Sequence, residues 1–104
     1  MRQLEIWRLT GDRGGSGKEV LAVILQHDLL RDLDTCIVAP LRPRDELPPI
    51  GRLRPEVTLE RRQYRLIIGR LSVVRRRALA ERIGTVSADA EEIRRALDEL
   101  LVGA

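Results

Sequence analysis

The strongest pattern in this chain is an apolar stripe in its last eighteen residues, residues 87–104. Large and small apolar side chains recur there at helical spacing, at Ile93, Leu97, Leu100, Leu101 and Ala104. This spacing predicts one helix with a single apolar face. Burying its four large aliphatic side chains would stabilise the fold by about 2 kcal/mol each. The rest of the chain must therefore supply a surface that covers this face, or a partner must do so.

The ends of this helix have separate signals. Ser87 is predicted to be the N-cap, with Asp89 at the positive end of the helix dipole. Opposite charges on the polar face predict three i,i+4 pairs, which are Glu91–Arg95, Arg94–Asp98 and Arg95–Glu99. We expect the stripe to pack on a sheet as far as Leu100, and residues 101–104 to contact a partner.

The segments before the helix have the patterns of strands and turns. Strands are expected at residues 3–9, 19–25, 35–41, 57–59, 63–68 and 71–74. Leu4 and Ile6 would share one face of the first strand, and Pro40 and Pro43 would end the third. Residues 42–55 are expected to be irregular, with turns at 49–51 and 60–62, and residues 76–82 to form a helical turn. Several strands followed by one helix predict a single mainly β domain, residues 1–104, built as a small antiparallel barrel or sheet with a C-terminal helix.

Composition limits what the surface of such a domain can bind. Trp7 and Tyr64 are the only aromatic residues, so the chain has no aromatic surface on which the bases of a single strand would stack. Its net charge of +3 comes from nineteen basic and sixteen acidic residues that are interspersed, as on an ordinary solvated surface. The exception is Arg75-Arg76-Arg77, a concentrated patch suited to phosphates or to an acidic peptide.

Several kinds of site are disfavoured by the residues present. Cys36 lies in an apolar run and is expected to be buried, and a single cysteine forms no intrachain disulfide, which suits the cytoplasm. One histidine and one cysteine do not make a zinc site. The glycine-rich segment 11–18 departs from a phosphate-binding loop at Asp12 and Glu19, so a hairpin loop is expected there. We find no signal peptide and no apolar run long enough for a membrane span.

The segment that follows the second expected strand is more informative. His27 and Asp28 are neighbours, which on a strand point to opposite faces and form no dyad. Leu29 and Leu30 stand between charged residues, either packed inward or exposed as a contact patch. With no catalytic group, metal site or cofactor motif in the sequence, a binding protein is favoured over an enzyme.

In its order of motifs, the chain resembles the CcdB-type toxins of bacterial toxin–antitoxin modules over nearly its whole length. The motifs are Gln26-x-Asp28-Leu29-Leu30, Ile37-Val38-Ala39-Pro40-Leu41, Arg52-Leu53-Arg54-Pro55-x-Val57, Tyr64-Arg65-Leu66 and Glu92-Ile93-x-x-Ala96-Leu97-Asp98-x-Leu100-Leu101-x-Gly103. The resemblance implies an SH3-like β-barrel that forms a homodimer. It also implies a cytoplasmic toxin that is not an enzyme and needs no cofactor. Such a toxin binds the A subunit of DNA gyrase and traps its cleavage complex on DNA. The partner implied is a CcdA-like antitoxin that neutralises the toxin with a disordered acidic segment.

Carried over by position, the gyrase-binding residues would be Val102, Gly103, Ala104, Leu101, Asp98, His27, Leu29 and Leu30. The best-known family members end in Trp-Gly-Ile, whereas this chain keeps Gly103 alone between Val102 and Ala104. Two alternatives therefore stay open. The chain could be a disarmed binding module that keeps the dimer and the antitoxin, or an endoribonuclease of the same fold that uses Arg75–Arg77, His27 and Asp28.

Overall fold

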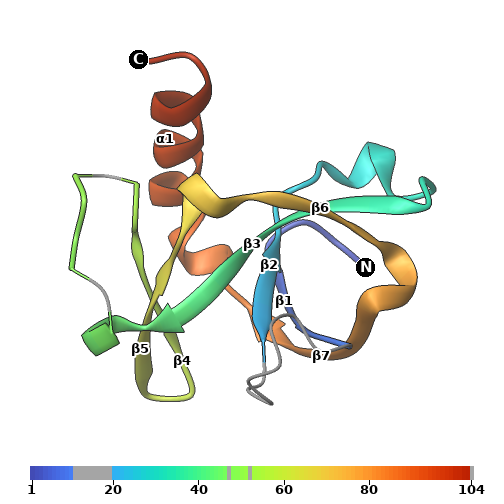
Figure 1. Ribbon diagram of the computed structural model, residues 1–104, viewed down its shortest axis with the longest axis horizontal. Helices are drawn as coiled ribbons and strands as arrows, with labels where there is room; N and C mark the ends of the chain where they lie inside the picture. Colours follow the sequence, from blue (N-terminus) through green and yellow to red (C-terminus); the bar gives the residue numbers. More distant parts are fainter. Residues whose placement is uncertain (11–19, 47, 52, 104) are drawn as a thin grey trace.

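The structure, a computed structural model, describes residues 1–10, 20–46, 48–51 and 53–103. The strands are β1 (Glu5–Leu9), β2 (Leu21–Ile24), β3 (Thr35–Pro43), β4 (Glu56–Leu59), β5 (Arg62–Leu66), β6 (Ser72–Arg75) and β7 (Leu79–Thr85), and the helix is α1 (Ala90–Leu101). Single 3-10 turns connect them, at η1 (Asp28–Leu30), η2 (Arg44–Glu46), η3 (Ile68–Arg70), η4 (Arg76–Ala78) and η5 (Ser87–Asp89). The expected mainly β fold with a C-terminal helix is confirmed (Figure 1). The glycine-rich loop and Ala104 lie outside the described residues.

The strands form one antiparallel sheet that curls into a half-barrel. Its strand order is β4-β5-β3-β2-β1-β7, with β6 paired to β3 off this path. The two ends of the sheet approach each other where Gly84 of β7 faces Leu59 of β4, since a Cβ at Gly84 would lie 3.1 Å from Leu59 Cδ1. A side chain here would be tight, and the Leu59 side chain would have to move by a few tenths of an ångström to admit its Cβ.

Strand β3 corrects the expectation that Pro40 and Pro43 end it. The strand runs to Pro43 and pairs with β2 along one edge, with Ala22 opposite Pro40. On the other edge β6 pairs as far as Val38 and β5 begins at Leu41. Pro40 falls in the gap between them, where its carbonyl accepts the Ile67 N–H at 2.9 Å. A proline is tolerated there because the ladder demands no N–H on that edge.

Strand β7 is the element that differs most from expectation. Residues 76–82 were expected to form a helical turn, but only η4 is helical, and the chain then pairs with β1 from Leu79 to Thr85. Alanine, leucine, glutamate and arginine favour helices locally, whereas β7 is imposed by its distant partner β1. The expected tight turn between β4 and β5 is present, with positive φ at Glu60 and Arg61, as a two-residue hairpin turn requires.

The core occupies both faces of the sheet. On the face that α1 covers, Ile6, Val23, Leu41, Leu66 and Ile68 pack in one cluster with Ile93 and Ala96 of α1. On the other face, a smaller cluster contains Ala22, Ile24, Cys36, Val38 and Val74. The predicted alternation of the first strand holds, since Leu4 and Ile6 join the first cluster while Trp7 and Leu9 join the second.

The helix departs from expectation at both ends. Ser87 is not its N-cap but opens η5, and no side chain caps α1 at Asp89. Leu100 is 37% exposed and does not belong to the core, because the sheet surface ends near Leu97. The predicted Arg94–Asp98 pair is formed at 2.9 Å and the Glu91–Arg95 pair at 3.8 Å.

Candidate functional site

The C-terminal end of α1 projects beyond the sheet (Figure 1). Its exposed apolar side chains, Leu101 and Val102, form what we call the apolar tip. Leu101 is 69% exposed and Val102 is 75% exposed, whereas Ile93, more than two turns earlier in α1, is buried. Gly103 ends the helix with φ +80°, and its N–H donates to the Glu99 carbonyl at 3.1 Å. This left-handed cap suits glycine. It turns the chain away from the helix axis just after the exposed side chains.

Asp98 lies beside this tip rather than in it. Its carboxylate accepts a hydrogen bond from Arg94 at 2.9 Å, and its carbonyl accepts the N–H groups of Val102 and Gly103. The residue thus holds the last turn of α1 by its backbone and leaves its half-exposed side chain paired with Arg94. It lies one turn before Val102, and its part in binding gyrase stays a prediction.

The second group of predicted site residues forms η1, a 3-10 turn between β2 and β3. The His27 Nδ1 atom accepts the Leu29 N–H at 3.1 Å and so caps the turn. The Asp28 carboxylate accepts the Gln3 N–H at 2.7 Å. Leu29 is 85% exposed and Leu30 is 49% exposed, so the exposed contact patch, and not inward packing, describes these leucines.

Gln26 is a positioning residue to which the sequence assigned no role. Its buried amide donates to the Leu30 carbonyl at 2.9 Å and accepts the Ile37 N–H at 3.3 Å. It thereby fastens η1 to the start of β3. The only signal in the sequence was its place at the head of the motif that contains Asp28, Leu29 and Leu30.

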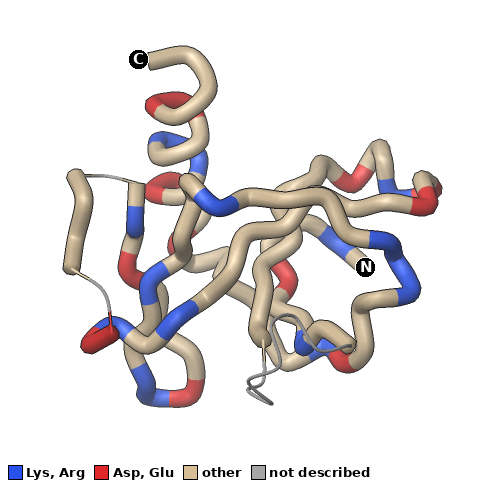
Figure 2. The backbone as a smooth tube through the Cα atoms, in the orientation of Figure 1, with Lys and Arg blue, Asp and Glu red and all other residues tan. Residues whose placement is uncertain are grey.

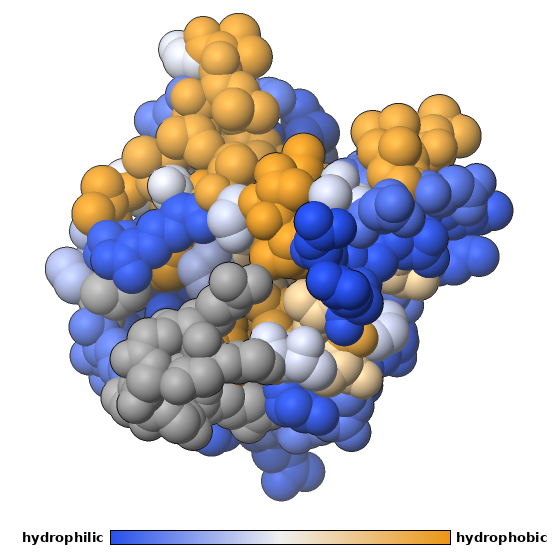
Figure 3. Space-filling view, turned by 45° about the vertical axis from the view of Figure 1, so that its right-hand side comes forward, coloured by the Kyte–Doolittle hydropathy of each residue, from blue (hydrophilic) through white to orange (hydrophobic). Residues whose placement is uncertain are grey.

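The two groups do not meet within one chain. Helix α1 stands beside η3, at the Ser72 end of β6, while η1 and the start of β3 lie at the Arg75 end. Both project past β6 in Figure 1, and Figure 3 shows hydrophobic surface on two separate projections. Between them, Val73 is 63% exposed and Ile37 is 36% exposed, and these two residues are register partners across β3 and β6.

The residues named for an endoribonuclease form two groups. Arg75, Arg76 and Arg77 line a separate concavity with Asp34. His27 and Asp28 are engaged by backbone amides at η1, and no ion pair or hydrogen bond links them to the three arginines among the described residues. Both groups lie toward the Arg75 end of β6, and an endoribonuclease role for them stays a prediction.

Other chemical sites find no support in the described parts of the chain. Cys36 is fully buried, and this burial raises the pKa of its thiol despite the nearby N-terminal ammonium and Arg76. The residues that the structure describes include no group of three or more His, Cys, Asp or Glu that would hold a metal ion. Within the same residues, no helix combines the length and apolar character of a membrane span.

Comparison with known proteins agrees with this architecture. The family model described as "CcdB protein" matches residues 3–103. A solved structure described as an endoribonuclease in complex with its cognate antitoxin, from Mycobacterial species, shares the fold with a TM-score of 0.79. The similarity covers 98% of this chain and 95% of that one at 12% sequence identity, so it concerns the fold alone. The comparison with curated proteins finds no match. Because the family model spans nearly the whole chain, this protein belongs to the CcdB family, the toxins of toxin–antitoxin modules.

Proposed function

We propose that this protein is a toxin that binds the A subunit of DNA gyrase as a homodimer and traps the covalent cleavage complex of gyrase on DNA. The apolar tip of α1 carries this proposal. Leu101 and Val102 are exposed beside a rigid left-handed cap at Gly103. Exposed apolar side chains on an ordered element are typical of a protein-binding surface.

A symmetric dimer would complete the binding surface. Strand β6 pairs with β3 alone among the described strands, so its other edge is open, and Val73 and Ile37 add apolar surface there. A two-fold axis beside β6 exchanges the ends of the strand. The apolar tip of one protomer would then lie near Leu29 and Leu30 of the other, joining the two groups that are separate in one chain.

An antitoxin is the second partner we propose. The solved structure with the same fold is described as bound to its cognate antitoxin, and toxins of the CcdB family act in such modules. The apolar tip has no catalytic group to switch off. Neutralisation would therefore act by covering the toxin surface that binds gyrase or by removing bound toxin from gyrase.

The decisive experiment mixes the purified chain with gyrase, ATP and supercoiled plasmid, followed by detergent and protease. Linear DNA should accumulate, because a trapped cleavage complex releases a double-strand break when the protein is removed. The variant Val102→Asp should abolish this product. Its matched control is Ile50→Asp, at a residue that is 50% exposed and belongs to neither group of predicted gyrase-binding residues, and this variant should trap as the natural chain does.

The alternative of a disarmed module has one specific observation in its favour. Val102 stands where the best-known family members carry a tryptophan, and a valine at this exposed place offers much less contact area. The variant Val102→Trp separates the two cases. If the natural chain is inert and Val102→Trp traps gyrase, the chain is a disarmed module. If neither forms a cleavage complex or inhibits supercoiling, the gyrase proposal is wrong.

A further inference from the structure

At the end of β6 and in its connection to β7 stand three consecutive arginines whose side chains have no partner among the residues that the structure describes. Most described arginines elsewhere are paired, as in Arg82–Glu5 at 2.7 Å and Arg42–Glu46 at 2.9 Å. No ion pair or side-chain hydrogen bond joins Arg75, Arg76 or Arg77 to any other described residue, and all three are exposed. Figure 2 shows this stretch as a continuous basic segment of the backbone.

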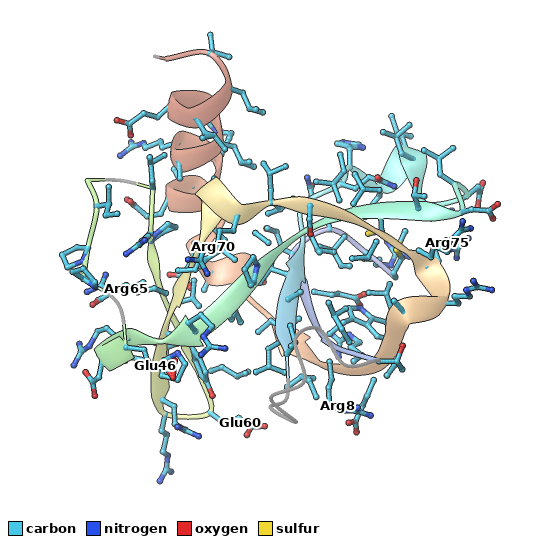
Figure 4. The ribbon with its side chains drawn as sticks, in the orientation of Figure 1. Arg8, Glu46, Glu60, Arg65, Arg70 and Arg75 are labelled. Atoms are coloured by element: carbon cyan, nitrogen blue, oxygen red, sulfur yellow. The ribbon has the colours of Figure 1, made fainter. Side chains whose placement is uncertain are left out.

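These side chains surround a defined concavity. Together with Asp34 they line a depression of about 380 Å³. The Arg76 N–H donates to the Asp34 carbonyl at 2.8 Å, which fixes η4 against the start of β3. Since a 3-10 turn has three residues per turn, successive side chains spread in different directions. Figure 4 shows Arg75 at the end of β6 remote from Arg70.

The local charge makes an anionic occupant favourable. Three guanidinium groups on adjacent residues repel one another, and the N-terminal ammonium acts on Cys36 from the same corner of the fold as Arg76 does. Each guanidinium can hold a carboxylate or a phosphate with two parallel hydrogen bonds. An occupant with several anionic groups would relieve this repulsion.

Two observations favour a peptide over a nucleic acid. No aromatic side chain lines the concavity, so unpaired bases would find no stacking surface there. Asp34 also lines it. A carboxylate there can accept hydrogen bonds from the N–H groups of a peptide backbone, whereas a phosphodiester chain has no such donor and would be repelled. Arginines flanking one acceptor therefore fit a chain that alternates carboxylates with amide N–H groups.

We infer that the concavity formed by Asp34 and Arg75–Arg77 is a docking site for an acidic, extended peptide segment. It rests on the proposed function only for the source of that peptide, which would be the acidic part of the antitoxin. The site is distinct from the apolar tip of α1, so the acidic segment of the antitoxin and gyrase would contact different residues. An antitoxin anchored here would reach the toxin without first displacing gyrase from the tip.

The test measures binding of a fluorescein-labelled peptide in which Glu and Asp alternate with Gly. Replacing all three arginines by glutamine should weaken binding about tenfold or more. A matched control replaces Arg31, Arg61 and Arg70 by glutamine, because these exposed residues also have no described partner and the net charge changes equally. The control should weaken binding only about twofold. Replacing Arg75–Arg77 by lysine should give an intermediate affinity, because lysine keeps the positive charge but lacks the planar guanidinium that binds a carboxylate with two hydrogen bonds.

Several outcomes would overturn the inference. Equal losses in both glutamine variants would show that net charge alone attracts the peptide. Displacement of the peptide by a labelled RNA of equal length, at lower concentration than by unlabelled peptide, would assign the site to nucleic acid. A change from dimer to monomer in the Arg75–Arg77 variant, measured by sedimentation, would assign it to a second copy of the chain.

The gyrase assay distinguishes this inference from the proposed function. A glutamine variant at Arg75–Arg77 that still traps gyrase but escapes its co-expressed antitoxin would support both. Peptide binding that depends on these arginines in a chain without effect on gyrase would support the docking site and contradict the gyrase proposal. Trapping of gyrase without peptide binding would support the gyrase proposal and contradict the docking site.

Discussion

At the scale of single residues, Glu5 ties the first strand to the last one. Its carboxylate accepts hydrogen bonds from Arg82 at 2.7 Å and from the Trp7 indole at 3.1 Å. Burial by itself favours the neutral acid, but the hydrogen bonds from Arg82, Trp7 and the Arg2 amide together hold the pKa of Glu5 below its ordinary value of 4.5. The charged form is thus the one that the folded state prefers.

This preference predicts how stability depends on pH. A carboxyl group with a lowered pKa in the folded state contributes stability above its unfolded pKa and loses it as the pH falls through the folded pKa. Glu5→Gln should therefore cost about 1–2 kcal/mol at pH 7, and the difference from the natural chain should shrink below about pH 4.5. Urea unfolding of both proteins across this pH range measures the difference in their free energies of unfolding. Glu81→Gln, at an exposed pair with Arg8, should cost less than about 1 kcal/mol, and a pH-independent cost at Glu5 would contradict the argument.

Gln26 provides a second test at this scale. Gln26→Leu leaves the Leu30 carbonyl and the Ile37 N–H without the partner they have now. The expected loss is about 1–3 kcal/mol of unfolding free energy, together with faster hydrogen exchange at the Ile37 amide. Gln63→Leu on exposed β5 is the matched substitution and should change neither quantity appreciably. Equal effects of the two changes would mean that η1 is held by other contacts.

At the scale of elements, the two candidate binding surfaces are the apolar tip of α1 and the turn η1, and different interactions stabilise them. The apolar tip of α1 depends on backbone geometry at Gly103, while η1 depends on side-chain hydrogen bonds from His27 and Gln26. The sequence predicted which residues belong to these surfaces, because the apolar period and the family motifs are local patterns. It did not predict the caps, since Ser87 lies in η5 and the structural use of His27 depends on a turn that the sequence did not indicate.

The tip of α1 can be tested through its cap. A Cβ at Gly103 would meet nothing within 4 Å, so only its φ of +80° opposes a side chain. Gly103→Ala should cost about 1 kcal/mol of local stability and increase hydrogen exchange at Val102, measured by NMR. Gly103→Asn should cost less, because asparagine tolerates this conformation. Gly69→Ala, also without close neighbours, serves as control, and an equal effect there would refute the role of the cap.

At the scale of the whole molecule, patterns along the chain predict the fold class and the approximate positions of the first six strands, but not how the strands pair or how the sheet closes. Helix-favouring residues in 79–82 concealed β7, whose pairing with β1 spans most of the sequence. The gap that accommodates Pro40 exists because β5 and β6 share one edge of β3. Similarly, the concavity at Arg75–Arg77 needs Asp34 from a distant segment, and only the charge run was visible beforehand.

The proposed dimer is the prediction that belongs to this scale. Val73→Asp places a charge on the open edge of β6, at a residue that is 63% exposed in the single chain. We expect it to shift the dimer toward monomer by about tenfold or more in dissociation constant, measured by sedimentation equilibrium. Thr58→Asp, on exposed β4, should leave the dimer intact. A monomeric natural chain, or a dimer unaffected by Val73→Asp, would exclude β6 as the interface.

The pairing of β1 with β7 also has a consequence for synthesis. Glu5 lies opposite Thr85, and Ile6 shares its core cluster with Ile93. A nascent chain must therefore expose one edge of β1, and the core around Ile6, until β7 and α1 have left the ribosome. A partner made beforehand thus has this period of elongation in which to be present before the edge of β1 is covered.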